Sequence, residues 1–408
     1  MTIPTLAEFE DAAAVLHGVI AQTPFDVSEY LTGILGAPVY LKLENLQRTG
    51  SFKIRGATYR LSRLTEQERA RGVVAASAGN HAQGVALAAQ KLGIPATIFM
   101  PLGVPVPKLL ATRGYGAEVV LEGATVETPL RLAAEFAERT GAVLIHPYDH
   151  RDVIVGQGTL GLEIADALPE VDTVVVGIGG GGLIAGVAAA VRARAAAAGR
   201  SVRIIGVQAE NSAAYPASLA AGEPLTVQTS PTIADGIAVA RPGDLTFAVI
   251  RDVVDEVVTV TEDDIARALL VLLERAKQVV EPAGAVGVAA ILAGKITATG
   301  PTAVILSGGN IDPLLLQRVV AHGLAASGRY MTLQIPLPDR PGQLARVSEL
   351  LAVAGANVIE ALHTRHGHGL QISEVILQLS VETRGEDHRA QVIAILEDAG
   401  FHPRIVQD

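Results

Sequence analysis

Four short segments of the chain combine residue types that can carry chemistry, and Lys53 is the candidate for the most reactive group. Lys53 follows a Thr-Gly-Ser turn at residues 49–51 and lies between Phe52 and Ile54, where a helix could begin. A lysine at a helix N-terminus in partly apolar surroundings has its ammonium form disfavoured, as an imine-forming amine requires. Because a single lysine is more often a solvated surface residue, this interpretation depends on the other three segments.

The second segment is a run of small and polar residues directly after a predicted buried strand: Ser77, Ala78, Gly79, Asn80 and His81. It leads into an Ala-rich helix, so its backbone N–H groups are free to hold a carboxylate. An ordinary turn with Ser77 or Asn80 as the helix N-cap explains the same run equally well.

The third segment is a run of glycines between a predicted strand and a predicted helix: Gly177, Gly179, Gly180, Gly181 and Gly182. Such a turn is an anion cradle by its geometry. It also satisfies the dinucleotide fingerprint G-x-G-x-x-G, with Glu210 as a candidate ribose-binding acid after the next strand. An NAD-dependent amino-acid enzyme is therefore one alternative.

The fourth segment is Ser307 with the Gly-Gly-Asn that follows it, at the end of another apolar run. Open α/β sheets bind ligands at this edge, and a hydroxyl there can hydrogen-bond a ring nitrogen without protonating it. A plain turn after a strand is the alternative.

The elements that must position these residues follow an α/β pattern. Between residues 55 and 320, Ala-rich helical stretches alternate with apolar runs at residues 72–76, 96–100, 118–121, 143–145, 173–176, 202–207 and 302–306. These runs are too apolar to have a solvated face, which predicts buried parallel strands.

The pattern changes after a small-residue stretch at 323–330. Strict alternation follows in Met331, Leu333, Ile335 and Leu337. A helix is predicted with one apolar face, formed by Leu344, Val347, Leu350, Leu351 and Ala354, and closed by Gly355. Further strands near 357–362, 375–381 and 401–406, with a helix over 386–399, complete a βαββαβ order, which is ferredoxin-like.

Length and composition restrict the function classes. The 408 residues predict two or three domains at ~150 residues each. Hydrophobic residues make up 49% and charged residues 18%, so the bulk of the chain is not disordered. The net charge of −10 disfavours nucleic acid and membrane surfaces as partners, and the lack of cysteine excludes disulfides and thiolate chemistry. The acidic N-terminus lacks a secretory signal, so a cytoplasmic location is expected.

The four segments, in this order, resemble the pyridoxal-phosphate enzymes of the tryptophan synthase β fold (fold type II), specifically the threonine dehydratases. The resemblance covers about residues 15 to 320 and includes matching segments at 232–239 and 281–285. It implies a catalytic domain at 1–322, in which a small subdomain of about 55–150 is inserted in a large one.

The remaining part of the chain resembles an ACT domain, a small-molecule-sensing ferredoxin-like module. The similar segments are 339–344 and 355–358, within an expected domain of 331–408 that follows a linker at 323–330. An amino-acid effector is expected near Gly342 and Asn357, at an interface between two such modules from different subunits of a homodimer or homotetramer. A dimerisation element without a ligand is the alternative.

The resemblance implies a role for each segment around pyridoxal phosphate. Lys53 holds the cofactor covalently, Phe52 packs against the pyridine ring and Asn80 hydrogen-bonds the phenolic oxygen. The glycines 179–182 hold the phosphate, and Ser307 accompanies the ring nitrogen. The loop from Ser77 to His81 binds the substrate carboxylate.

The implied activity is β-elimination from L-threonine to 2-oxobutanoate and ammonia, with L-serine as a slower substrate that gives pyruvate. Serine racemases are similar but carry a second serine in the carboxylate loop as an acid–base group, and here that position is Ala78. This favours a dehydratase over a racemase. One methyl group is worth only ~1–3 kcal/mol, so the preference for threonine over serine is harder to predict.

The remaining alternatives explain less of the sequence. An NAD-dependent enzyme leaves Lys53, Asn80 and Ser307 without a function. A non-enzymatic amino-acid sensor would not need the lysine. No metal site is expected, because His363, His366 and His368 are interpreted as flanking a hairpin turn.

Overall fold

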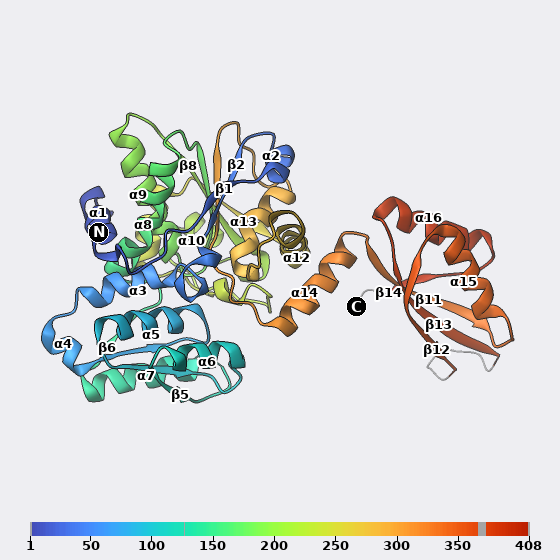
Figure 1. The fold of residues 1–408 in the computed structure, drawn as a ribbon, viewed down its shortest axis with the longest axis horizontal. Coiled ribbons are helices and arrows are strands. Elements are labelled where there is room, and N and C mark those ends of the chain that lie inside the picture. Colours follow the sequence, from blue (N-terminus) through green and yellow to red (C-terminus); the bar gives the residue numbers. More distant parts are fainter. Residues whose placement is uncertain (1, 126, 366–372, 407–408) are drawn as a thin grey trace. The chain divides into compact units, whose positions relative to one another are not determined.

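The computed structural model describes residues 2–125, 127–365 and 373–406 of the chain (Figure 1). The chain forms two compact units, Met1–Leu315 and Leu316–Asp408. The boundary falls within the helix α14 (Pro313–Ala326), which includes the first residues of the predicted linker at 323–330. Among the described residues, no helix combines the length and the apolarity needed to cross a membrane.

A six-stranded sheet is the centre of the first unit. Its strands are β1 (Phe25–Val27), β2 (Val39–Leu43), β7 (Thr173–Gly177), β8 (Arg203–Ala209), β9 (Glu256–Val260) and β10 (Thr302–Leu306). They lie in the order β1-β2-β10-β7-β8-β9, and every neighbouring pair except β1–β2 is parallel. The predicted lack of a solvated face is confirmed for the central strands, where Val174, Val175 and Val176 are fully buried. It is wrong for the predicted strands at 118–121 and 143–145, which lie at the edges of the smaller sheet and are only partly buried.

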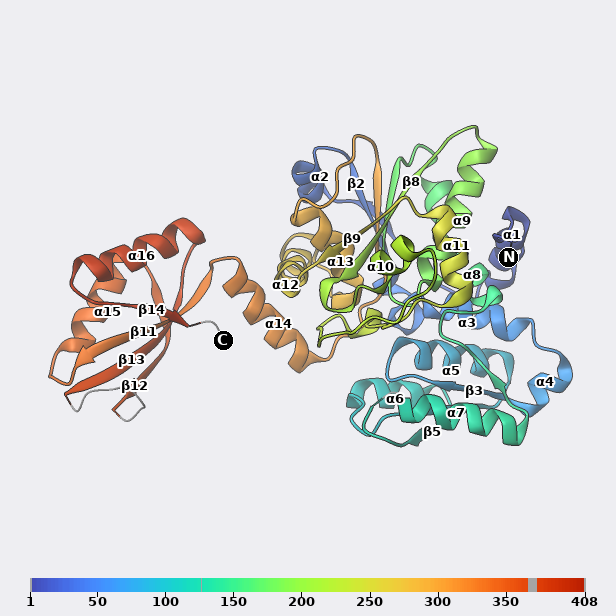
Figure 2. The ribbon, with the colours of Figure 1, turned by 180° about the vertical axis from the view of Figure 1, so that it is seen from behind.

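Helices cover both faces of this sheet (Figures 1 and 2). One face carries α1 (Leu6–Leu16), α8 (Arg151–Ala167), α9 (Gly182–Ala197) and α11 (Asp244–Val253). The other carries α2 (Glu29–Leu35), α12 (Glu262–Val271) and α13 (Pro282–Leu292). The short helix α10 (Ala214–Ala221) follows β8.

A smaller sheet is formed by the part of the chain between β2 and β7. Its strands are β3 (Val73–Ala76), β4 (Ala96–Met100), β5 (Glu118–Leu121) and β6 (Val143–Leu144), in the parallel order β5-β4-β3-β6. The helices that accompany it are α3 (Lys53–Ser62), α4 (Glu66–Arg71), α5 (Asn80–Leu92), α6 (Val106–Gly114) and α7 (Glu127–Thr140). The helix α3 lies between the two sheets, against α5 and α8 (Figures 1 and 2).

Each parallel sheet has one point where the strand order reverses. The chain leaves β7 toward β8 on one side, whereas β10 lies on the other side of β7. In the small sheet, β4 and β6 flank β3 in the same way. The crevice at the carboxyl ends of such strands is where open α/β sheets bind ligands. Three of the four chemical segments follow β3, β7 and β10, and therefore lie at these two reversal points.

The second unit is a four-stranded antiparallel sheet with helices. Its strands are β11 (Tyr330–Pro338), β12 (Asn357–Thr364), β13 (Glu374–Glu382) and β14 (Arg404–Val406), in the order β12-β13-β11-β14. With α15 (Gln343–Ala354) and α16 (Glu386–Asp398) it is the predicted βαββαβ ferredoxin-like fold. The alternation predicted from residue 331 is confirmed, because Met331, Leu333, Ile335 and Leu337 are buried.

One predicted core residue of this unit is not in the core. Leu344 is 43% exposed, whereas Val347 and Leu351 of the same helix are buried. Leu344 lies in the first turn of α15, and the buried residues of this helix begin one turn later, at Val347. His366 and His368, considered above as candidate metal ligands, lie outside the described residues.

Three strands of the large sheet have no strong signal in the sequence. The edge strand β1 has three residues, two of them exposed, and the edge strand β9 is mostly only partly buried, so neither has a long, fully apolar run. The strand β2 includes Lys42, a charged residue that is only 2% exposed. Its burial depends on an ion pair with a residue far along the chain, which local sequence does not reveal.

Candidate active site

The backbone before Lys53 is held by the end of β10. Thr49 and Gly50 adopt the left-handed conformation, with φ of 68° and 67°. Ser51 then forms an isolated antiparallel bridge with Gly308, and the N–H of Phe52 donates to the carbonyl of Ser307 at 3.2 Å. These contacts bring the first residue of α3 next to the residues that follow β10.

The amine of Lys53 lies in a largely desolvated position. Its Nζ donates to the carbonyl of Pro147 at 3.0 Å and lies 5.2 Å from the centre of the Phe52 ring. Burial lowers the pKa of Lys53 to about 8, against a smaller opposite effect of the Glu281 carboxylate. An amine with this pKa has a substantial neutral, nucleophilic fraction near neutral pH.

The segment from Ser77 to His81 joins β3 to α5. The N–H of Gly79 donates to Ser77 Oγ at 3.1 Å, and Gly79 is the N-cap of α5. Gly84, in the next turn of α5, allows close contact with Lys53, because a side-chain carbon there would lie 3.2 Å from Lys53 Cβ. The loop therefore lies beside the start of α3.

His81 differs from the other residues of this loop because it is buried, whereas they are partly exposed. Its Nε2 lies 2.8 Å from the carbonyl of Ile145, so Nε2 carries the proton and donates it. Burial, together with the charge of Lys53, lowers the pKa of His81 to about 3. The ring is neutral at pH 7 and connects the loop to the residues that follow β6.

Asn80 is the centre of a hydrogen-bonded cluster that joins the two sheets. Its Nδ2 donates to Glu281 Oε1 at 2.7 Å, and its Oδ1 accepts from Asn310 Nδ2 at 2.8 Å. Glu281 is 4% exposed, and burial raises its pKa to about 7 although the Lys108 ammonium acts in the opposite direction. Ser307, 6% exposed, directly precedes the Gly308 carbonyl that accepts from the Glu281 N–H at 3.0 Å.

The glycine segment after β7 packs against aromatic side chains. A side-chain carbon on Gly180 would lie 2.4 Å from the Tyr148 ring, and one on Gly181 would lie 2.1 Å from the Tyr215 hydroxyl. The carbonyl of Gly180 accepts from Thr246 Oγ1 at 2.6 Å. Within the described part of the chain, no carbonyl accepts from the N–H groups of residues 179–182. These donors lie at the positive end of the 16-residue helix α9 and are available to an anion.

A methyl group is expected to be poorly tolerated at Gly181. Its φ of 97° is unfavourable for alanine, and the new carbon would overlap the buried Tyr215 hydroxyl. Gly222→Ala is the matched control, because Gly222 has a φ of 77° but no atom within 4 Å of the added carbon. Urea unfolding should show Gly181→Ala to be less stable than the control by about 1–3 kcal/mol. Equal losses in the two variants would contradict the packing argument.

Sequence analysis missed the segment from Pro147 to Asp149, which connects Lys53 to the glycines. Pro147 accepts from Lys53, and Tyr148 covers the glycine turn. The carboxylate of Asp149 caps α11 by accepting from the N–H groups of Leu245 at 2.8 Å and of residues 244 and 246 at 3.1 Å. No local pattern marks these residues, since their partners are distant in sequence.

A buried ion network fixes α3 from the other side. The guanidinium of Arg55, fully buried, forms hydrogen bonds to Glu44 at 2.8 Å and to Glu163 at 2.6 and 3.0 Å. Lys42 completes the network by an ion pair of 2.7 Å with Glu163. These residues come from β2, the turn after it, α3 and α8, so the network holds the helix that begins with Lys53.

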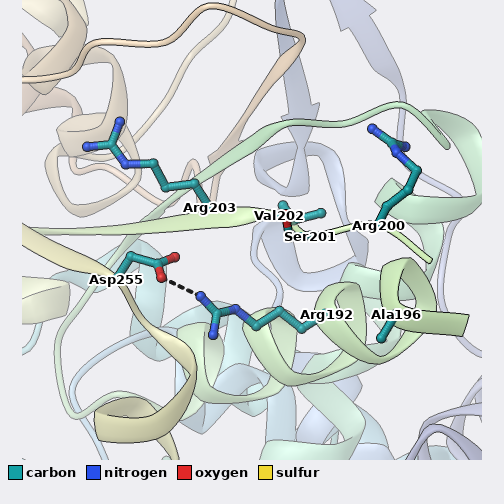
Figure 3. Close-up of a pocket in the computed structure, with 7 residues that line it drawn as sticks. All are labelled: Arg192, Ala196, Arg200, Ser201, Val202, Arg203 and Asp255. Carbon is teal, nitrogen blue, oxygen red and sulfur yellow. Dashed lines mark hydrogen bonds and ion pairs between the residues drawn. The ribbon is translucent and has the colours of Figure 1, made fainter. Parts of the chain in front are cut away.

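Two cavities in the described part of the first unit bear on the candidate site. The larger, about 520 Å³, is lined by Arg192, Arg200, Arg203 and Asp255 (Figure 3). It lies where α9 ends and β8 begins, which is the edge of the sheet opposite to the glycine turn, and Arg192 forms an ion pair with Asp255 there. The second, about 290 Å³, lies next to the Asn80 cluster and is lined by Lys108, Gln83, Asn310 and Asp312. The second cavity is the one that belongs to the candidate site.

The two expected effector residues of the second unit lie at opposite ends of α15. Gly342 precedes the helix, and Asn357 begins β12 just after it, where its Nδ2 donates to Glu382 at 3.0 Å. A helix of 12 residues is ~18 Å long. One amino acid cannot contact both residues of the same module, so a shared site requires two modules.

Comparisons with known proteins agree with this arrangement. The family model of pyridoxal-phosphate dependent enzymes matches residues 16–308, and that of ACT domains matches residues 331–401. The L-threonine ammonia-lyase of Thermotoga maritima is 47% identical over 98% of this chain and 99% of its own length.

Among solved structures, threonine deaminase isoform 2 of Solanum lycopersicum is similar with a TM-score of 0.73 and 37% identity, covering 78% of this chain and 93% of its own. Maize serine racemase gives a TM-score of 0.73 and 36% identity over 79% of this chain and 99% of its own. The chain therefore belongs to the pyridoxal-phosphate dependent enzymes of fold type II and carries a C-terminal ACT domain.

Proposed function

We propose that the chain is an L-threonine ammonia-lyase that converts L-threonine to 2-oxobutanoate and ammonia, with L-serine as a secondary substrate. The observation that carries the proposal is the position of Lys53, a desolvated amine beside the reversal points of both sheets. The similarity to the Thermotoga maritima enzyme over nearly the full length of both chains supports the substrate class.

The residues around Lys53 fit pyridoxal phosphate. The amine suits covalent attachment to an aldehyde, and the N–H groups of residues 179–182 suit a phosphate. Ser307 suits a ring nitrogen that is hydrogen-bonded without being protonated, and Asn80 suits the phenolic oxygen. The remaining residue with an expected role in cofactor binding, Phe52, lies within 5.2 Å of the Lys53 amine, where its ring would pack against the cofactor.

The chain's own groups then perform the acid–base work. The bound cofactor supplies a conjugated system that stabilises the electron pair left when the Cα proton is removed. Lys53 Nζ, which would be released when the substrate's own amine takes its place, would take that proton, and the loop from Ser77 to His81 would hold the substrate carboxylate through its N–H groups. His81 is neutral and bonded to Ile145, so its role is to position the loop. The Cα proton and the Cβ hydroxyl of the substrate leave as one molecule of water. One molecule of water is taken up again when the resulting enamine is hydrolysed to the oxo acid and ammonia.

Ala78 favours elimination over racemisation. A racemase requires a second acid–base group on the opposite face of the substrate, and a methyl group can neither donate nor accept a proton. This distinguishes the proposed activity from that of the serine racemases, which share the fold. An NAD-dependent reaction remains the other candidate from the glycine run, but it gives no function to Lys53, Asn80 or Ser307.

The proposal is tested with purified protein loaded with pyridoxal phosphate. We expect 2-oxobutanoate and ammonia in equal amounts from L-threonine, slower pyruvate formation from L-serine, and no D-serine. Formation of D-serine at a rate similar to that of pyruvate would identify a racemase instead. Tight binding of NAD without an absorbance band from pyridoxal phosphate would identify the alternative use of the glycine turn.

Cofactor loading is expected to accelerate with pH up to about 8 and then to level off. Only the neutral amine attacks an aldehyde, and its fraction falls about tenfold per pH unit below the pKa. Lys53, with a pKa of about 8, should follow this profile. The measurement is the rate at which a visible absorbance band forms in cofactor-free protein between pH 6 and 10. A rate that still rises tenfold per unit above pH 9 would indicate an ordinary, solvated lysine.

We further propose that the ACT domain binds an amino-acid effector between two modules of a homodimer or homotetramer. The positions of Gly342 and Asn357 at opposite ends of α15 support a shared rather than an internal site. The full chain should respond to isoleucine, valine or another amino acid in the threonine assay, and Asn357→Ala should weaken that response. If no amino acid changes the activity, the proposal of an effector site is wrong, and the ACT domain would serve only as a dimerisation element.

A further inference from the structure

Lys108 is a second lysine at the candidate site that no step of the proposed mechanism uses. It lies on α6 in the small sheet's part of the molecule, and its side chain is 13% exposed. It lines the cavity of about 290 Å³ together with Asn310, which is bonded to Asn80. The amine is therefore directed into the site rather than into bulk solvent.

The ammonium of Lys108 lies near one carboxylate but makes no hydrogen bond to a described residue. Its nearest carboxylate is Asp235 Oδ2, at 3.6 Å, which is too long for an N–H···O hydrogen bond. Burial raises the pKa of Glu281, and the nearby Lys108 ammonium partly offsets that rise. No described residue accepts a hydrogen bond from Nζ, so the three donors remain available to a ligand.

The loop proposed to hold the substrate carboxylate faces this amine. A side-chain carbon on Gly79 would lie 3.6 Å from Lys108 Nζ, with nothing else within 4 Å. Gly79 thus leaves an open space between the loop and the ammonium. A carboxylate held by the loop's N–H groups in that space would be within reach of Nζ.

We propose that Lys108 binds the α-carboxylate of the amino-acid substrate and exchanges Asp235 for that carboxylate when the substrate enters. This inference rests on the proposed function and extends it to a residue that determines substrate affinity. Asp235 is 63% exposed, so it can return to solvent at little cost once it is displaced. Asp235 begins the short helical turn Asp235–Ile237, which follows α10 and belongs to the part of the molecule built on the large sheet. Lys108 belongs to α6, beside the small sheet. The exchange therefore occurs where these two parts meet.

The exchange predicts that substitutions at the two members of the ion pair affect KM differently. Lys108→Met removes the cation, and the KM for L-threonine should rise about 10–100-fold, as expected for a lost charge-assisted hydrogen bond. The kcat should change less than about threefold, since the bond is present before and during reaction. Asp235→Asn removes the competitor, so KM should fall or stay the same. If the Lys108–Asp235 ion pair only stabilised the structure of the site, KM would rise in both variants.

Two further variants test the folding and the charge. Lys91→Met is the matched control, because Lys91 is an exposed lysine of α5 away from the cavity, and its KM should equal that of the wild type. Lys108→Arg retains the positive charge and should restore most of the affinity that Lys108→Met loses. Failure of arginine to recover any affinity would contradict a role for the charge.

A binding measurement separates this inference from the proposed function. Isothermal titration of the cofactor-loaded protein compares L-2-aminobutyrate, which has no leaving group, with 1-aminopropane, which lacks the carboxylate. The ratio of the Kd for 1-aminopropane to the Kd for L-2-aminobutyrate should be at least tenfold larger in the wild type than in Lys108→Met. An active wild type whose preference is unchanged in Lys108→Met overturns the inference alone. A wild type that cannot be loaded with the cofactor, or that once loaded does not bind L-2-aminobutyrate, overturns the proposed function, and the inference with it.

Discussion

Lys53→Ala is expected to lower kcat/KM for L-threonine at least ~10³-fold, because one side chain then fails to provide both covalent attachment and proton transfer. General acid–base catalysis alone contributes ~10²–10⁴-fold. The alanine variant should also lack the visible band near ~410 nm that a lysine-bound cofactor gives. The chain has no tryptophan and 7 tyrosines, so this band is readily seen against the protein's own absorbance.

The control for Lys53→Ala must show that the fold is intact. Lys53 makes one hydrogen bond, to the carbonyl of Pro147, and its loss does not leave a buried charge. The unfolding midpoint of the apo-protein should therefore change little, and Lys91→Ala should keep both the band and the activity. A variant that keeps the visible band would place the covalent link at another lysine.

Arg55→Met is expected to lower the free energy of unfolding by about 3–5 kcal/mol, the cost of leaving a buried charge without its partner. Glu44 is fully buried and receives two of the guanidinium's hydrogen bonds at 2.8 Å. The measurement is urea unfolding of both proteins. Since Arg55 also holds α3, the variant should lose cofactor affinity as well as stability.

The pH dependence of this loss has a definite sign. Burial alone would raise the pKa of Glu44, but in the wild type the charge and hydrogen bonds of Arg55 outweigh it and keep that pKa below its usual value. Without Arg55, the folded-state pKa of Glu44 should rise above its unfolded value. The free-energy cost of the buried, unpaired Glu44 carboxylate is then present at neutral pH, and it decreases as Glu44 becomes protonated in acid. The difference between the two proteins should shrink from pH 8 to pH 4.5.

Arg63→Met is the matched control for this prediction. Arg63 follows the same helix, but its ion pair with Asp11 is 4.0 Å long and both side chains are more than half exposed. An exposed pair of this kind contributes little, so the variant should lose less than about 1 kcal/mol. A similar loss in both arginine variants would show that burial of the network does not determine its effect.

The sequence determined the elements that depend on neighbouring residues. Apolar runs followed by Ala-rich helices predicted β3, β4, β7, β8 and β10, because burial on both faces leaves a local signature. Alternation predicted β11 and β13 for the corresponding reason. The segments at Lys53, Ser77 and Ser307 were recognisable because each chemical residue lies within a turn of consecutive residues.

Only the tertiary structure decided how these segments meet. Lys53 forms a hydrogen bond to Pro147, 94 residues later in the chain. Asn80 forms hydrogen bonds with Glu281 and Asn310, both more than 200 residues later. The pKa of Lys53 is lowered by the packing of both sheets around it, and the neutral state of His81 depends on a carbonyl after β6. The same is true of Lys108, whose position opposite Gly79 depends on how α6 packs beside α5. In a parallel sheet the crossovers bring distant strand ends together, so residue types are encoded locally, whereas their distances and charges follow from the strand order.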